Sequence, residues 1–125
     1  PSMELPILYA LTWPERVPDS GVPSFDPVGL GGLTFEHVRH EQFPMLGLGI
    51  AAGRAGGAAP AVFNAANEEA VAQFLAGALS FGGIAERVSA ALDELASLPG
   101  DSLEALLAAD AAARAHVKNR IVQEP

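Results

Sequence analysis

The chain has 125 residues, half of them hydrophobic, and its 15 acidic residues against 7 basic residues give a formal net charge of −8. This length fits one ordinary domain with a modest core of Ala, Leu and Val, and the charge argues against nucleic acid and anionic membranes as partners. The absence of cysteine excludes disulfides and thiolate metal sites, and no apolar run approaches the roughly 20 residues that cross a bilayer, so a soluble protein is expected.

The first twelve residues predict a short helix. Apolar residues are frequent between Leu5 and Leu11, Pro6 lies near the start, where proline is tolerated, and Pro14 ends the helix soon afterwards. So short a helix needs another surface to pack on. Because the chain also begins without methionine, we expect it to be part of a longer protein.

Residues 13–42 predict an extended connector. Their density of Pro and Gly rules out a regular helix and interrupts any long strand, although one short strand is expected around Gly32–Phe35. The segment Gly29–Gly32 superficially resembles a phosphate-binding loop. No apolar strand precedes it and no helix with a Lys-Ser or Lys-Thr pair follows, so we reject that interpretation.

His37 and His40 are candidate metal ligands in this connector. Their i, i+3 spacing, with Glu36 and Glu41 beside them, would bring the side chains toward a common ion on a helix. The segment is not clearly helical, so solvated side chains are the simpler interpretation. His116 is interpreted only as favourable charge near a helix C-terminus.

The segment Asn64–Val71 is the most distinctive of the chain. After a helix that begins near Pro44 and ends at Gly56-Gly57, Asn67 is predicted to cap a helix that runs to Leu79. Two acidic residues then fall in its first turn, where the helix dipole favours carboxylates. The apolar face of this helix is predicted to hold Val71, Phe74, Leu75, Ala78 and Leu79.

Two further helices complete the expected bundle. Ser80 is expected to cap a helix that ends before Pro99-Gly100, and a last helix is expected to begin near Asp101 or Ser102. The apolar positions of this last helix are predicted to be Leu103, Leu106, Leu107, Ala113, Val117 and Ile121. Three to five helices joined by short turns favour a small helical bundle.

The run from Gly100 to Glu104, with Asp101-Ser102-Leu103 at a helix start, resembles the phosphopantetheine attachment site of acyl carrier proteins. The alternative function is therefore a free-standing acidic helical binding or carrier module that is modified on Ser102. A carrier protein continues with further helices, whereas a single long helix follows here. Capping by Asp101 or Ser102 also explains the segment.

Several motifs occur in a fixed order along the chain. They are Pro1-Ser2-Met3-Glu4-Leu5-Pro6, Trp13-Pro14-Glu15-Arg16-Val17, Leu33-Thr34-Phe35, Phe43-Pro44, Asn64-Ala65-Ala66-Asn67-Glu68 and Leu107-Ala108-Ala109-Asp110-Ala111-Ala112-Ala113-Arg114. In this order the series resembles the C-terminal third of the 1-deoxy-D-xylulose 5-phosphate reductoisomerases. The resemblance covers residues 1–121.

The resemblance implies an enzyme. Members of this family isomerise 1-deoxy-D-xylulose 5-phosphate and reduce the resulting aldehyde with NADPH to 2-C-methyl-D-erythritol 4-phosphate, in non-mevalonate isoprenoid biosynthesis. A divalent metal, Mg²⁺ or Mn²⁺, holds the substrate oxygens. The family's NADPH domain and acidic metal motif would precede Pro1, so this chain alone is expected to bind neither cofactor and to be inactive. The resemblance also implies a cytoplasmic bacterial protein whose partner is the rest of the parent chain, with a homodimer formed chiefly through the central domain.

The resemblance assigns three parts and one site. Residues 1–12 would close the central α/β catalytic domain, residues 13–57 would form the connector with the first bundle-side helix, and residues 58–125 would form the C-terminal helical domain. The fold class of the chain is therefore expected to be mainly α. The family usually has Pro-Asp-Met where this chain has Pro1-Ser2-Met3. Met3, and then Pro1, are expected to line the pocket near nicotinamide and substrate, and no catalytic or metal-binding residue is expected in this chain.

Overall fold

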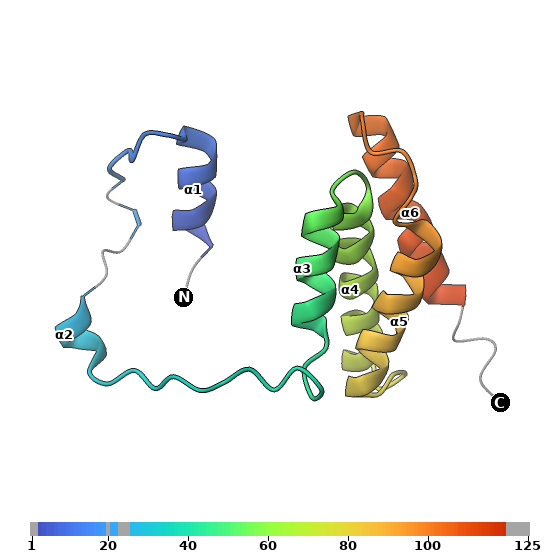
Figure 1. Ribbon diagram of the computed structural model, residues 1–125, viewed down its shortest axis with the longest axis horizontal. Helices are drawn as coiled ribbons and strands as arrows, with labels where there is room; N and C mark the ends of the chain where they lie inside the picture. The colour runs from blue at the N-terminus through green and yellow to red at the C-terminus, as the bar shows by residue number, and fades with distance from the viewer. Residues whose placement is uncertain (1–2, 20, 23–25, 120–125) are drawn as a thin grey trace. The chain divides into compact units, whose positions relative to one another are not determined.

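The computed structural model describes residues 3–19, 21–22 and 26–119. Over these residues it contains six α-helices and no strand, which confirms the mainly α fold class (Figure 1). No helix in the described ranges is both long and apolar enough to cross a membrane. The chain divides into two units, residues 1–37 and residues 38–125.

The first unit begins with α1 (Glu4–Thr12), which confirms the predicted short helix. The Thr12 hydroxyl donates a hydrogen bond to the Leu8 carbonyl oxygen at 2.9 Å, within the last turn. No residue of α1 is buried, and the Leu11 side chain is 80% exposed. Leu8 and Tyr9 are half-buried, whereas Leu5, Ile7 and Leu11 of α1 remain exposed within the described part of this unit.

The connector contains one short helix that the sequence did not predict. In α2 (Pro27–Leu30) the Asp26 carboxylate accepts a hydrogen bond from the Val28 amide at 3.0 Å. Residues 31–39 have no regular secondary structure, so the short strand expected at Gly32–Phe35 is wrong. A strand needs a neighbour for its backbone hydrogen bonds, and no other strand exists among the described residues.

The second unit is a bundle in which one helix contacts all the others. Its helices are α3 (Met45–Ala55), α4 (Ala59–Leu75), α5 (Phe81–Leu95) and α6 (Leu103–Asn119). Helix α4 packs against α3, α5 and α6, as Figure 1 shows. The turn between α3 and α4 is made by Gly56 and Gly57, at φ 67° and 55°, a conformation that favours glycine.

Two serines begin the last two helices, as predicted. The Ser80 hydroxyl accepts a hydrogen bond from the Gly83 amide at 3.1 Å, and the Ser102 hydroxyl accepts one from the Ala105 amide at the same distance. Each bond satisfies a backbone donor that has no partner within the first turn of a helix.

Helix α4 does not begin at Asn67, and the predicted cap there is wrong. The helix starts eight residues earlier at Ala59, with Pro60 in its first turn, and continues through Asn64 and Asn67. Alanine has the highest helix propensity and proline is well tolerated in a first turn, so residues 59–66 are helical themselves. The two asparagines are not sufficient to interrupt them.

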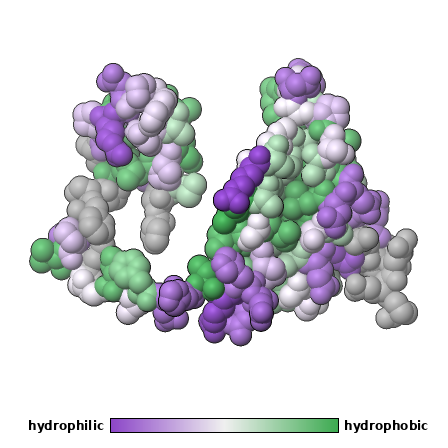
Figure 2. All heavy atoms as spheres, in the orientation of Figure 1, coloured by the Kyte–Doolittle hydropathy of each residue, from purple (hydrophilic) through white to green (hydrophobic). Residues whose placement is uncertain are grey.

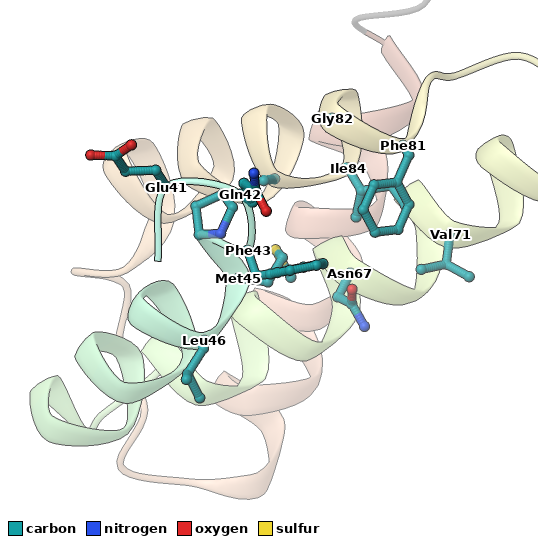
Figure 3. Close-up of a pocket in the computed structure, with 12 residues that line it drawn as sticks. Glu41, Gln42, Phe43, Met45, Leu46, Asn67, Val71, Phe81, Gly82 and Ile84 are labelled. Atoms are coloured by element: carbon teal, nitrogen blue, oxygen red, sulfur yellow. The ribbon is translucent and has the colours of Figure 1, made fainter. Parts of the chain in front are cut away.

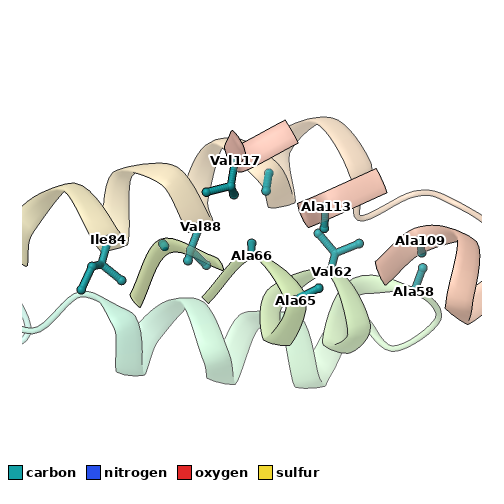
Figure 4. Close-up of a cluster of buried hydrophobic side chains, with 11 residues drawn as sticks. Ala58, Val62, Ala65, Ala66, Ile84, Val88, Ala109, Ala113 and Val117 are labelled. Carbon is teal, nitrogen blue, oxygen red and sulfur yellow. The ribbon is translucent and has the colours of Figure 1, made fainter. Parts of the chain in front are cut away.

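The core of the bundle is built from small side chains. Its largest fully buried residues are Val62, Val88 and Val117, which lie among alanines of α4 and α6 (Figure 4). Side chains of this size let the backbones of packed helices approach closely. The buried hydrophobic cluster contains Ala58, Val62, Ala65, Ala66, Ala70, Ile84, Val88, Ala91, Ala109, Ala113 and Val117.

Several predicted core positions are exposed. On α4, Leu75 is 77% exposed and Phe74 is 37% exposed, and on α6, Leu103 and Leu107 are 67% and 61% exposed. Alanines take the buried positions of these helices instead, because the close contacts between them leave no room for larger side chains. Ile121 lies outside the described residues.

Candidate functional site

The distinctive segment Asn64–Val71 lies in the middle of α4 and contributes to a polar network with α6. The Asn64 side-chain amide donates to Glu68 Oε1 at 3.1 Å, and Arg114 Nη2 lies 2.7 Å from Glu68 Oε2. Arg114 also donates to Asp110 through Nε at 2.8 Å and Nη2 at 3.1 Å. The hydrogen bonds from Arg114 and then from Asn64 lower the pKa of Glu68 below its usual value.

A second polar contact joins the same helices. Lys118 Nζ lies 3.4 Å from Glu69 Oε2, and the Gln73 side-chain amide donates to Glu69 Oε1 at 3.3 Å. Glu68 and Glu69 therefore pair with α6. The sequence had predicted them in the first turn of a helix, and that prediction is wrong because both lie in the interior of α4. These carboxylates bridge α4 and α6 at the edge of the alanine-packed contact, which is a structural role.

The two residues expected in a family pocket belong to the first unit. Met3 directly precedes α1, its carbonyl accepts a hydrogen bond from the Ile7 amide at 3.1 Å, and its side chain is 68% exposed. Pro1 lies outside the described residues. The role of Met3 and Pro1 as pocket walls stays a prediction.

The histidines do not form a metal site in the described structure. His37 belongs to the irregular stretch 31–39 and His40 to the turn that follows, so their helical spacing does not apply. In the described parts of the chain, no three His, Asp or Glu residues are grouped so that they could hold a metal ion. His116 Nδ1 lies 3.3 Å from Glu94 Oε2, which places this histidine at the contact between α5 and α6.

Ser102 is exposed at the start of α6, where its hydroxyl acts as the helix cap described above. This geometry is what the capping interpretation predicts. No contact of Ser102 favours the carrier interpretation over it.

A cavity of the second unit lies where α3 and α5 begin, against the second half of α4 (Figure 3). It has a volume of about 560 Å³. Its lining is mainly apolar, and Asn67 contributes a half-buried side-chain amide to the wall. Within the described residues that amide has no recorded hydrogen-bond partner. The lining residues are Glu41, Gln42, Phe43, Pro44, Met45, Leu46, Asn67, Val71, Phe81, Gly82, Ile84 and Ala85.

Exposed apolar side chains surround this cavity. Phe43 and Leu46 are each 45% exposed and Phe81 is 63% exposed. The Phe81 ring packs edge to face against Phe74, with 5.9 Å between the ring centroids. Figure 2 shows apolar and polar residues side by side on the face of the bundle that is in view.

The chemistry of this cavity is that of binding. Glu41 is the one ionisable residue in its lining. The cavity therefore lacks the paired acid and base, or the several metal ligands, that acid–base or metal-assisted catalysis needs. The cavity could not be predicted from the sequence, because Phe43 and Phe81 lie at helix starts, outside the periodic apolar pattern. Two aromatic residues beside the capping positions Pro44 and Ser80 were the available signal.

Comparison with known proteins supports the resemblance found in the sequence. Residues 1–116 match the family model described as DXP reductoisomerase C-terminal domain. The chain is 50% identical over 120 residues to 1-deoxy-D-xylulose 5-phosphate reductoisomerase from Thermosynechococcus vestitus, and 53% identical over 114 residues to that from Cupriavidus taiwanensis. These alignments cover 94% and 91% of this chain.

Solved structures give the same result. The reductoisomerase from Zymomonas mobilis in complex with NADPH aligns with a TM-score of 0.73 and 38% identity, over 99% of this chain. A DOX-P reductoisomerase in complex with magnesium aligns with a TM-score of 0.70 and 37% identity, over 98% of this chain.

The matches cover only part of each relative. The chain spans 29% of the length of both curated relatives named above, and 32% of each of the two solved chains. The family model that it matches describes the C-terminal domain of DXP reductoisomerase. The chain therefore belongs to the 1-deoxy-D-xylulose 5-phosphate reductoisomerase family.

Proposed function

We propose that this chain is the C-terminal part of a longer reductoisomerase, which converts 1-deoxy-D-xylulose 5-phosphate to 2-C-methyl-D-erythritol 4-phosphate with NADPH and a divalent metal. The observation that carries the proposal is the match of residues 1–116 to the C-terminal domain of that family, with about 30% of the relatives' length covered. Within the longer enzyme, the role of this chain is structural.

The cofactors would be held outside this chain. The names of two structural relatives record NADPH and magnesium as bound. The described residues here do not fit a metal, since they lack a group of three His, Asp or Glu ligands. The metal would act as a Lewis acid and NADPH would supply hydride. Residues upstream of Pro1 would bind both of them.

The same proposal assigns the parts of the chain. Residues 1–12 would close the catalytic domain, residues 13–57 would form the connector and first bundle helix, and residues 58–125 would form the C-terminal helical domain. The exposed apolar side chains of α1 support an assignment to a larger domain, because they need a surface to pack on. The complete enzyme would be a cytoplasmic bacterial homodimer.

An activity assay tests the proposal. The 125-residue chain and the longer protein encoded by its reading frame should be assayed for NADPH oxidation with substrate and Mg²⁺ or Mn²⁺. We expect turnover by the longer protein and none by the 125-residue chain. Turnover by the short chain, or a reading frame without an upstream NADPH-binding region, would contradict it.

The role of Met3 can be tested in the longer protein. Met3→Ala should raise the KM for NADPH or substrate several-fold, because an apolar, polarisable wall would be removed. Leu11→Ala is the matched control, since Leu11 is also an exposed apolar residue of the same segment. Equal kinetic effects of the two substitutions would assign Met3 to packing.

A further inference from the structure

Helix α3 is the most weakly held helix of the bundle. Only Ala52 of α3 is buried, whereas α4 and α5 bury six and five residues. Met45 and Leu48 pack partly buried against the buried hydrophobic cluster, but the cluster itself contains no residue of α3. Among the described residues, α3 contacts α4 and α5 but not α6, and no side-chain hydrogen bond or ion pair is recorded between it and another helix. The core of α4, α5 and α6 is therefore complete without α3.

Two glycines weaken α3 without a steric reason. A Cβ atom on Gly47 or Gly53 would meet no atom within 4 Å, and neither residue has a positive φ. Gly49 differs, because a Cβ atom there would lie 3.2 Å from the ring of Phe63. A glycine inside a helix loses more backbone freedom than alanine, so each one favours the unfolded segment about two- to fivefold. Gly47 and Gly53 therefore lower the stability of α3 and gain no packing in return.

The end of α3 allows a change of chain direction. Gly56 and Gly57 follow the helix, and both adopt positive φ. Glycine occupies many backbone conformations at little cost, so these two residues can rotate without strain. The next two residues, Ala58 and Ala59, are buried and anchor the start of α4. Rotation at the glycine pair therefore moves α3 and leaves α4 in place.

We propose that α3 opens as a unit, hinged at Gly56–Gly57, while α4, α5 and α6 stay folded. Opening lengthens the connector, since the eleven residues of α3 span about 16 Å as a helix and up to about 36 Å as extended chain. The state of α3 thereby sets the reach of the chain between the first unit and the other three helices. The proposal concerns this chain alone and does not depend on the proposed function.

Hydrogen exchange of the 125-residue chain, followed by NMR, tests the opening. The amides of residues 48–55 in α3 should exchange at least about a hundredfold faster than those of residues 62–70 in α4 and 84–91 in α5. Replacing both Gly47 and Gly53 by alanine should slow the exchange of α3 by about tenfold. Equal exchange of α3 and α4 in the unsubstituted chain would overturn the proposal.

Ser80→Ala is the matched control, because it removes the cap of α5 and leaves α3 untouched. It should speed the exchange of α4 and α5 about fivefold, as the loss of a helix cap does, and leave the exchange of α3 unchanged. An equal increase in α3 would mean that α3 unfolds only together with the bundle, and the proposal would fail.

Thiol labelling gives a second measurement, since the chain has no cysteine of its own. Ala52→Cys places a thiol on the buried face of α3, and Val62→Cys places one in the core on α4. A maleimide should react with Ala52→Cys at least about tenfold faster than with Val62→Cys, because only the first thiol is uncovered when α3 opens. Equal rates would contradict the opening. The exchange measurement on the unsubstituted chain decides the question if either cysteine variant loses its helical circular dichroism.

Discussion

Glu68 is held in its ionised form by the groups around it. The guanidinium of Arg114 and the amide of Asn64 both donate to its carboxylate, which lowers its pKa in the folded chain. A carboxyl group with a lowered folded pKa stabilises the fold fully above its unfolded pKa, near 4.5 here. The stabilisation is lost as the pH falls through the lower, folded value.

The stability of the bundle should therefore fall less steeply with acid in Glu68→Gln than in the wild type. Urea unfolding midpoints between about pH 6 and about pH 3 measure this difference. Glu104→Gln is the control, because Glu104 is exposed and no ion pair is recorded for it within the described residues, and it should follow the wild type. Wild-type behaviour of Glu68→Gln would contradict the assignment.

Asn67 lies in the interior of α4, so it contributes nothing as a cap. Asn67→Ala should leave the 125-residue chain equally stable or more stable by about 0.5 kcal/mol, because alanine favours helix interiors. Ser80→Ala should cost about 1 kcal/mol, since Ser80 does cap a helix. Urea unfolding compares the two, and a loss of about 1 kcal/mol in Asn67→Ala would restore the cap that the sequence predicted.

The turn before α6 packs directly on the turn before α4. A Cβ atom on Gly100 would lie 2.4 Å from the backbone nitrogen of Ala58 and from the carbonyl carbon of Gly57. Backbone atoms cannot move aside as a flexible side chain does. The approach of these two turns therefore requires glycine at residue 100.

Gly100→Ala should destabilise the bundle by about 2–3 kcal/mol, because the turns must separate. Gly53→Ala, on a helix with open space at its Cβ position, should stabilise it by about 0.5–1 kcal/mol. Chemical denaturation of the 125-residue chain measures both. A neutral Gly100→Ala would mean that the two turns do not approach as described.

Helix boundaries that depend on local chemistry could be predicted from the sequence. Ser80 and Ser102 satisfy backbone amides in the next turn, and the pair Gly56-Gly57 adopts positive φ, so the signal and its effect lie within a few residues. Asn67 has the same capping chemistry but follows eight helical residues of α4, and the helix propensity of those residues prevailed.

The candidate sites depended on residues that are distant in the sequence. Arg114 and Glu68 are 46 residues apart, and only the packing of α6 on α4 brings them together. The cavity where α3 and α5 begin likewise combines Phe43, Asn67 and Phe81 from three segments. No local pattern reports such a combination, so the sequence identified the family and the helices but not the contacts between them.

The two units of the chain predict a simple response to proteolysis. Trypsin cleavage after Arg39, which is exposed at the junction of the units, would separate residues 1–39 from the bundle. We expect the remaining bundle to keep its helical circular dichroism and to melt within about 2 °C of the intact chain. In Arg39→Gln, cleavage should move to Arg16. Loss of the helical signal after cleavage would show that the bundle depends on the first unit.

The alanines between α4 and α6 have a consequence for how this domain tolerates change. Ala65, Ala66 and Ala113 have no exposed surface, and the largest fully buried side chains are valines. Only glycine is smaller than alanine, and any larger residue must push the two backbones apart. The distance between the helices is therefore set by the polypeptide backbone itself. Substitutions on the outer surface of the bundle should therefore leave the distance between α4 and α6 unchanged.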